Sequence, residues 1–430
     1  MYNKFNESRD NITISSKNNF YENKEGGTVQ RTAERNKSKV FAPGEIDSLT
    51  LRNRTIRSAC FEGMCQHATP SETLIEHHRK VAAGGVGMTT VAYCAVSKDG
   101  AAFAHEMWMR EEIVPILKKL TDAVHKEGAA ASIQLAHCGF FASKAATGIT
   151  PIGPSRKFCS YRYSFCRPMT TEDLNRVKED FGKAALMAKK AGFDAVEIHA
   201  GHGYLLSQFL SPWTNSRTDE YGGPLENRVR YPASVIKQVR SVVGPDFPIL
   251  VKMNLEDGFK GGLTVDESVE VAKRFEAEGA SALVPSCGFT ARTSLYMMRG
   301  HTPLTELVRS EKNPVAKMAT FMFGRFLVKD YEFKEMFLFE QAKTIRAAVK
   351  IPVVYIGGIL SVDNMNKAMN EGFEFVQIGR ATVRDPNIIN KMMSGEVTAS
   401  DCDHCNRCIG EMAATGVFCT SEKKGLLKDS

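Results

Sequence analysis

The sequence predicts a closed parallel α/β barrel over residues 39–395. Short apolar segments of strand length alternate along the chain with amphipathic segments of helical period. Such alternation is typical of a parallel sheet whose strands are joined by helices. Eight such units in one chain favour a TIM barrel over an open sheet. No G-x-G-x-x-G motif follows a strand and opens a helix, so a Rossmann domain for a nicotinamide cofactor is not indicated.

The expected elements follow the hydrophobic pattern. Strands are expected at residues 55–59, 86–91, 131–136, 195–200, 248–254, 282–286, 352–357 and 375–379. Helices are expected at residues 114–127, 171–191, 225–242, 265–278 and 364–371. The segment 287–350 is long for a connection and rich in aromatic residues and Met. It is interpreted equally well as a lid or substrate wall over the barrel mouth and as a helical core that buries its own aromatic residues.

Composition limits the classes of function. The chain has 430 residues, of which 43% are hydrophobic, as in a globular enzyme with a large core. Its formal charge of +7 is spread out without a dense run of Lys and Arg, so we expect no nucleic-acid partner. No apolar run approaches the ~20 residues of a membrane span, so we expect no membrane partner either. The first 38 residues are polar, lack apolar periodicity and a secretory signal, and are expected to form a disordered tail.

The cysteines are unevenly distributed. Of eleven, seven are scattered singly and four crowd into residues 396–430, which we call the Cys-rich extension. This clustering favours metal ligation in a reducing compartment over a disulfide framework, so we expect a cytoplasmic protein. The four cysteines have the spacing C-x-x-C-x-x-C with one more ten or so residues later, and can supply four thiolates to one metal centre: Cys402, Cys405, Cys408 and Cys419.

Three polar side chains are predicted to face the barrel mouth. Gln134, His199 and Lys252 each alternate with apolar residues on the opposite face of an expected strand. If the apolar faces meet the helices, these three side chains point inward near the carboxyl ends of their strands. Active sites of barrel enzymes lie at this end. One polar residue in a strand is commonly structural, whereas three that converge on one mouth favour a function.

The most informative stretch is residues 197–228, which reads EIHAGHGYLLSQFLSPWTNSRTDEYGGPLENR. It places His199, His202 and Tyr204 directly after an apolar strand. Imidazoles and a phenol at a strand end are suited to hydrogen-bonding an electron-poor carbonyl group and delivering a proton.

This stretch resembles the old yellow enzyme, or NADH:flavin oxidoreductase, family. Shorter pieces that support the resemblance are LRNRTIRSACFEGM, GGVGMTTVAY, SIQLAHCG, PILVKMNLEDG and VVYIGGI followed by VQIGRA. The resemblance implies an FMN-dependent TIM barrel that reduces activated alkenes, such as enones, enals or unsaturated acyl compounds, with NAD(P)H as electron donor. The implied partner is a small-molecule substrate, and a homo-oligomer or an external electron donor stays open.

The resemblance also implies which residues hold FMN. The backbones of Ala59 and Cys60 are expected under the flavin, and Phe61 stands where Thr, Cys or His is often found. Gln134 is expected to hold the pyrimidine edge. Lys252 stands where many members have Arg, beside the flavin N1/O2 region. The expected phosphate cradle consists of four residues after the last two strands: Gly357, Gly358, Gly379 and Arg380.

The implied chemistry divides between three side chains. His199 and His202 are expected to hydrogen-bond the carbonyl or nitro oxygen of the substrate, which makes the β-carbon more electrophilic toward hydride. Tyr204 is expected to protonate the α-carbon as general acid. Two alternatives are an amine-demethylating dehydrogenase and a flavin redox sensor or electron-transfer subunit without turnover.

The segment CDHCNRCIGEM resembles the cluster-binding segment of trimethylamine dehydrogenase and 2,4-dienoyl-CoA reductase. The resemblance implies a [4Fe–4S] cluster on Cys402, Cys405, Cys408 and Cys419. A structural zinc site on the same ligands, with His404 as a substitute, is an alternative, and so is a site without metal.

Overall fold

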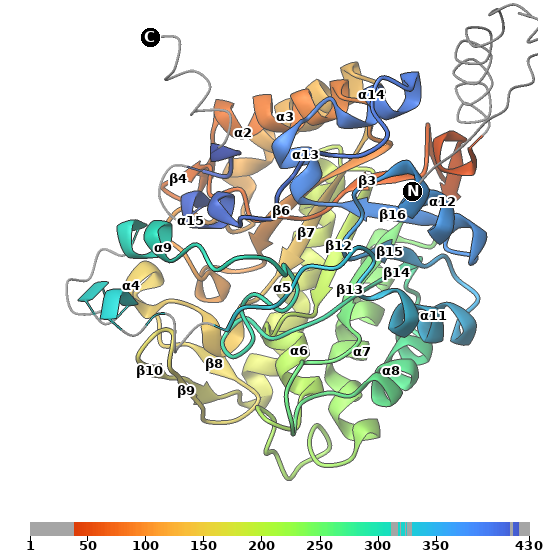
Figure 1. Cartoon of the computed structure of the whole chain (residues 1–430). Helices are drawn as coiled ribbons and strands as arrows, with labels where there is room; N and C mark the ends of the chain where they lie inside the picture. The colour runs from red at the N-terminus through yellow and green to blue at the C-terminus, as the bar shows by residue number, and fades with distance from the viewer. Residues whose placement is uncertain are drawn as a thin grey trace, which may run out of the picture.

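Eight parallel strands form a closed barrel in the computed structural model, which describes residues 38–310, 317–318, 320–322, 324, 329–412 and 416–420. The strands are β3 (Thr55–Arg57), β6 (Met88–Ala95), β7 (Ala130–Ala136), β12 (Ala195–Ala200), β13 (Ile249–Asn254), β14 (Ala282–Ser286), β15 (Val354–Ile356) and β16 (Phe375–Ile378). Neighbours pair in chain order, β16 pairs with β3, and Leu283 bridges to Val353, so the barrel closes (Figure 1). The predicted TIM barrel is confirmed. Residues 1–37 of the expected tail lie outside the described residues.

Helices cover the outside of the barrel. The long ones are α2 (Glu72–Ala83), α3 (Val114–Lys126), α5 (Thr171–Lys190), α7 (Leu225–Val243), α8 (Val265–Ala277), α11 (Phe339–Ala348) and α12 (Val362–Asn370). All five expected helices are present, with ends that differ by one or two residues. Thr170 and Thr264 begin α5 and α8 with capping boxes, in which side chain and backbone satisfy each other's free groups.

The amino end of the barrel is filled by an apolar plug. A hairpin of β1 (Gly44–Ile46) and β2 (Leu49–Leu51) packs Ile46 and Leu51 against the first residues of several strands. The packing at Gly44 is so close that a Cβ there would lie 2.9 Å from the Phe375 ring. Polar strand residues therefore gather further along the strands, toward the carboxyl ends.

One strand is longer than predicted. The expectation of residues 86–91 was wrong at the carboxyl end, because β6 continues to Ala95. Its pairing with β7 is irregular between Val91 and Cys94 and then resumes. The extension matters because it carries Tyr93 up to the barrel mouth.

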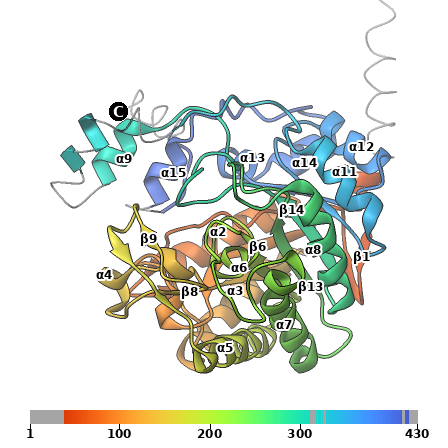
Figure 2. The same ribbon diagram turned by 90° about the horizontal axis from the view of Figure 1, so that it is seen from below.

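The connections at the mouth carry additional structure. Between β7 and α5, two small sheets form from β8 (Ile152–Gly153) with β11 (Arg167–Pro168) and from β9 (Phe158–Cys159) with β10 (Ser164–Phe165). Near the end of the chain, α15 (Arg407–Met412) packs on α9 (Leu304–Ser310), as Figure 2 shows. No helix in the described part of the chain is both long enough and apolar enough to span a membrane.

The segment 287–350 is only partly within the described residues. Near its carboxyl end, Met336, Leu338 and Phe339 are buried in the core at the start of α11. This part agrees with the helical-core interpretation. Positions 311–316, 319, 323 and 325–328 lie outside the described residues. Phe321 and Met322 are described and exposed, so this part of the run does not form a helical core.

Candidate active site

A buried carboxylate organises the barrel mouth. Glu197 accepts a hydrogen bond on Oε1 from Gln134 Nε2 at 2.6 Å and one on Oε2 from Gln377 Nε2 at 2.7 Å. Lys252 Nζ lies 2.9 Å from the same Oε1. All four side chains are at most 1% exposed, so solvent does not screen the ion pair. A buried pair that is fully hydrogen-bonded is costly to break from either side.

Strand register brings this network together. Glu197 lies opposite Gln134 across the pairing of β12 with β7, and His199 lies opposite Lys252 across the pairing of β12 with β13. Ser58 extends the network, because its Oγ donates to Gln377 Oε1 at 3.2 Å. The predicted inward positions of Gln134, His199 and Lys252 thus agree with the structure. Gln134 and Lys252 each already bond Glu197, and Lys252 Nζ also donates to Ser58 Oγ at 3.4 Å, which leaves the Gln134 amide oxygen and one Lys252 proton to a ligand.

The imidazoles of His199 and His202 meet at the end of β12. Their ring centres are 4.9 Å apart and their planes nearly perpendicular. Burial, and then the charge of Lys252, lowers the pKa of His202 to about 3, and burial also depresses the pKa of His199. Both rings are therefore neutral near pH 7. Gly201 N–H donates to His199 Nδ1 at 3.3 Å, so the ring proton lies on Nε2 and can be donated to a ligand.

The backbone of His202 is held in an unusual conformation. Its φ of 57° lies in the left-handed region that residues other than glycine rarely adopt. Its N–H donates to Asn254 Oδ1 at 2.9 Å, and its carbonyl oxygen accepts from Thr290 N at 2.9 Å. Its Nε2 lies 2.7 Å from Ser286 Oγ. Residues from two other strand ends therefore maintain the conformation, as is common at functional sites.

Two buried tyrosines complete this group. Tyr204 Oη lies 2.9 Å from Tyr93 Oη, and the Tyr204 ring is 4.8 Å from that of His199. Burial raises the pKa of both phenols above the ordinary value, so both keep their protons near neutral pH. A protonated phenol beside neutral imidazole donors is an arrangement that can bind a carbonyl oxygen and protonate a neighbouring carbon.

Aromatic side chains line one side of the histidine–tyrosine group. The centre of the Phe61 ring lies 5.0 Å from the ring centres of both Tyr93 and Phe103, and the ring centres of Phe141 and Tyr204 are 6.0 Å apart. Phe61, which departs from the residues often found at its position, therefore packs as part of an apolar wall. Its side chain has no group that can hydrogen-bond a cofactor.

The loop after β3 carries Ala59 and Cys60, both half-buried. It is anchored by Arg57, a fully buried arginine that pairs with the buried Glu62. Arg57 also donates to the backbone oxygens of Thr90 at 2.7 Å and Cys60 at 3.3 Å. The loop backbone is thus fixed at the barrel mouth without using the side chains of Ala59 and Cys60.

The expected phosphate cradle lies at two adjacent strand ends. Gly357 and Gly358 follow β15 with φ of 118° and 73°, which favour glycine. Gly379 follows the neighbouring β16 and precedes α13 (Arg380–Arg384). The Arg380 guanidinium turns toward the Cys-rich extension, where Nη1 donates to Arg299 O and Asn406 Oδ1, each at 2.7 Å. Arg380 therefore connects the cradle with the extension.

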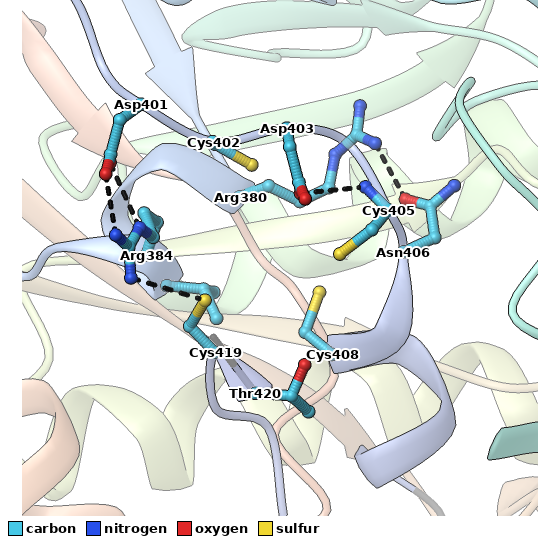
Figure 3. Close-up of a pocket in the computed structure, with 11 residues that line it drawn as sticks. Arg380, Arg384, Asp401, Cys402, Asp403, Cys405, Asn406, Cys408, Cys419 and Thr420 are labelled. Carbon is cyan, nitrogen blue, oxygen red and sulfur yellow. Dashed lines mark hydrogen bonds and ion pairs between the residues drawn. The ribbon is translucent and has the colours of Figure 1, made fainter. Parts of the chain in front are cut away.

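The four C-terminal cysteines surround one small cavity, and their sulfur atoms point toward the same space (Figure 3). The cavity has a volume of about 80 Å³ and is also lined by Arg380 and Arg384. Burial raises the pKa of the Cys408 thiol to about 12. Four thiols beside two guanidinium groups fit the donor chemistry of a four-thiolate metal centre. Among the described residues, however, no three His, Cys, Asp or Glu side chains already stand in a metal-binding arrangement.

The extension is docked directly on the barrel mouth. Val417 N–H donates to Glu62 O at 2.7 Å, and a Cβ on Gly379 would lie 3.2 Å from Cys60 Sγ. Cys60 also raises the pKa of Cys408, so the expected flavin loop and the cysteine cavity are neighbours. His404, the alternative ligand, does not line the cavity and stacks on Phe333 with ring centres 3.5 Å apart.

Sequence reasoning missed four residues of the site. Glu197 and Gln377 carried a signal, since Glu197 shares a strand face with His199 and Gln377 lies in the VQIGRA motif. Tyr93 lay beyond the expected end of its strand. Ser286 is a single polar residue at a strand end, and only its contact with His202 identifies it.

Comparisons with known proteins identify the family and the fold. A model of the NADH:flavin oxidoreductase / NADH oxidase family matches residues 39–297, and one of dihydrouridine synthase matches residues 319–424. The chain is 39% identical over 381 residues to a 4,4'-dithiodibutanoate disulfide reductase of Rhodococcus erythropolis, covering 88% of this chain and 94% of that protein. It spans only 51% and 53% of two further curated relatives.

Solved structures show the same fold. A 2-naphthoyl-CoA reductase in complex with 2-naphthoyl-CoA superposes with a TM-score of 0.73 at 25% identity, over 88% of this chain and 58% of the other. An old yellow enzyme homologue from Zymomonas mobilis superposes with a TM-score of 0.67 at 22% identity, over 85% of this chain and 95% of the other.

Proposed function

The chain belongs to the NADH:flavin oxidoreductase / NADH oxidase family, and from this premise we propose that it is an FMN-dependent reductase of activated alkenes. NAD(P)H is the proposed electron donor, and an enone, enal or unsaturated acyl compound is the proposed acceptor. The observation that carries the proposal is the pair of neutral imidazoles beside a protonated, buried phenol. Such a substrate needs hydrogen-bond donors at its carbonyl oxygen and a proton at its α-carbon.

We infer that FMN binds at the carboxyl end of the barrel. Lys252 and Gln134 fit the polar edge of a flavin, because Glu197 holds both at the mouth and Lys252 supplies a positive charge. The other proposed contacts are largely through the backbone and involve Ala59, Cys60, Gly357, Gly358, Gly379 and Arg380. Bound there, FMN would supply the hydride that no side chain of the chain can provide.

The chain's own residues would handle the carbonyl oxygen and the proton. His199 donates from Nε2, and His202, fixed by its backbone bonds, stands beside it as the second proposed contact to the oxygen. Tyr204 then gives its phenolic proton to the α-carbon. Tyr93, hydrogen-bonded to Tyr204, is placed to return a proton to it. Burial of His199, Tyr204 and Tyr93, with His202 half-buried beside them, limits the access of water to the oxygen.

Rapid mixing of the reduced enzyme with a panel of enones tests this proposal. We expect flavin reoxidation much faster than in buffer alone, together with conversion of the enone to the saturated carbonyl compound. Reoxidation no faster than in buffer would contradict the function. A redox sensor without turnover is disfavoured, because a sensor has no use for the proton donor Tyr204.

Reduction of a disulfide is a second candidate, favoured by the 39% identity to the Rhodococcus disulfide reductase over 94% of that protein. In this reaction NAD(P)H and one proton convert a disulfide into two thiols and NAD(P)⁺. Because no carbon is protonated, Tyr204→Phe should leave the reduction of 4,4'-dithiodibutanoate unchanged and slow that of an enone. The same variant therefore separates the two functions.

We further propose that Cys402, Cys405, Cys408 and Cys419 bind a [4Fe–4S] cluster. The support is their shared cavity with Arg380 and Arg384, which offset the negative charge of thiolates. Iron, sulfide and zinc analysis of anaerobically purified protein tests it. Finding zinc, or finding no metal, would contradict the proposed cluster.

A further inference from the structure

Two cations flank one tryptophan at the outer edge of the aromatic wall. Lys157 Nζ lies 4.0 Å from the centre of the Trp213 ring, and the Arg292 guanidinium lies 5.0 Å from the same ring. Arg292 also lies 4.3 Å from the Phe259 ring. These contacts with aromatic faces, and a 2.7 Å hydrogen bond from Lys157 Nζ to the backbone oxygen of Trp213, orient the cations without neutralising their charge.

Neither cation has an acidic partner among the residues that the structure describes. Within the described part of the chain, neither Lys157 nor Arg292 forms an ion pair with a carboxylate. Buried arginines elsewhere in the fold, Arg57 and Arg228, do have carboxylate partners. Burial, and then the neighbouring charge of Arg292, lowers the pKa of Lys157. Two like charges that repel each other, with no acid between them, form a site that an anion would stabilise.

The cations are connected to the proposed catalytic group. Thr290, two residues before Arg292, donates both its N–H and its Oγ to the backbone oxygen of His202, each at 2.9 Å. The Phe289 ring lies 5.4 Å from that of Trp213 and packs on Gly203, where a Cβ would approach it to 2.4 Å. The rings of Trp213 and Phe289 therefore form one continuous aromatic surface from the cations to the segment that carries His202 and Tyr204.

We propose that Lys157 and Arg292 bind the carboxylate of the oxidising substrate while its reducible group lies against His199 and His202. The inference rests on the proposed function and narrows its substrate class to unsaturated carbonyl compounds with an acidic group at the far end of an apolar body. Trp213 and Phe259 would contact that body. Arg292 is exposed, so an acidic group reaches the site directly from solvent.

A rigid pair of ligands tests the proposal: 4-carboxycinnamaldehyde and its methyl ester, which differ by one negative charge. Each is titrated into oxidised holoenzyme and followed by calorimetry. Lys157→Gln and Arg292→Gln should each weaken binding of the acid about tenfold and change binding of the ester less than about twofold. Arg292→Lys, which keeps the charge, should retain most of the affinity.

Arg156→Gln is the matched control. Arg156 is an exposed cation next to Lys157 in the chain, and its guanidinium lies over Phe165 at 4.5 Å instead of over Trp213. It should leave binding of the acid unchanged. An equal loss for acid and ester, or a loss from Arg156→Gln as large as that from Arg292→Gln, would overturn the proposal.

The phosphates of NAD(P)H are the other source of negative charge. If Arg292→Gln weakens NADH or NADPH binding in the reductive half-reaction and leaves the acid unaffected, the cations serve the donor and the proposal is wrong. Failure of the proposed function is distinguishable, because neither aldehyde would then reoxidise the flavin. The calorimetric preference for the acid does not depend on turnover.

Discussion

The barrel mouth and the Cys-rich extension are built in opposite ways. At the mouth, Glu197, Gln134 and Lys252 are almost fully buried, and Glu197 bonds both of the others, so their positions are fixed by partners within the protein. In the extension, the four cysteines are half-buried around a shared cavity, and no three possible ligands of the described residues have closed into a metal site.

The difference follows from the backbone beneath each region. The mouth residues lie on strands whose pairing determines their relative positions, which is how a site is pre-organised. The cysteines lie on short irregular segments and on α15, whose geometry a bound metal would complete. The mouth should therefore respond to loss of internal partners, and the extension to loss of its ligand.

Breaking the mouth network should have the largest effect. Glu197→Ala leaves the Lys252 ammonium buried without a counter-charge and should lower the free energy of unfolding by about 3–5 kcal/mol. Denaturant unfolding of the holoenzyme measures it. The double variant Glu197→Ala/Lys252→Met should recover most of the loss, and wild-type stability of the single variant would contradict the role given to Glu197.

Removing the proton donor should have the next largest effect. Tyr204→Phe should slow flavin reoxidation by an enone on the order of 100-fold, because the α-carbon loses its acid. Reduction by NAD(P)H should stay within about twofold of wild type, since that step needs no such proton. Stopped-flow absorbance measures both half-reactions. Equal slowing of both would assign Tyr204 to cofactor binding.

Changing the extension should leave the barrel largely intact. Cys408→Ser should remove most of the bound metal and lower the free energy of unfolding by only about 1 kcal/mol, because the barrel core is not touched. Metal analysis and flavin content are the measurements. Cys166→Ser, at a buried cysteine away from the cavity, is the control that should keep its metal. Loss of FMN together with the metal would show that the two regions are not independent.

The smallest effect is expected from pH. The pKa of His202 lies at about 3 and that of Tyr204 above its ordinary value, so neutral imidazole and protonated phenol both persist between pH 5 and 9. Enone-driven reoxidation should vary less than about twofold over this range. Acid below about pH 4 should protonate His202 and weaken carbonyl binding. A midpoint between pH 6 and 7 would contradict the burial of the imidazoles.

Much of the barrel and part of the site followed from local pattern. The strands at residues 195–200 and 282–286 were predicted to the residue, because their apolar runs end at polar or glycine-rich sequence. The strand ending at Ala95 was not, because the irregularity in its pairing with β7 is a property of two strands and leaves no local sign. Tyr93 was missed for that reason.

By itself, the sequence determined the closed barrel and the inward face that carries Gln134, His199 and Lys252, because strand periodicity is a local property of the chain. Only the tertiary structure decided the partners across that face. Gln377 reaches Glu197 over 180 residues of sequence, and Tyr204 reaches Tyr93 over 111. Closure of the sheet brings such strand ends together. The hydrophobic pattern within one strand gives no information about which distant strand its end will contact. The same holds for Lys157 and Arg292, which come from separate connections and meet only across Trp213.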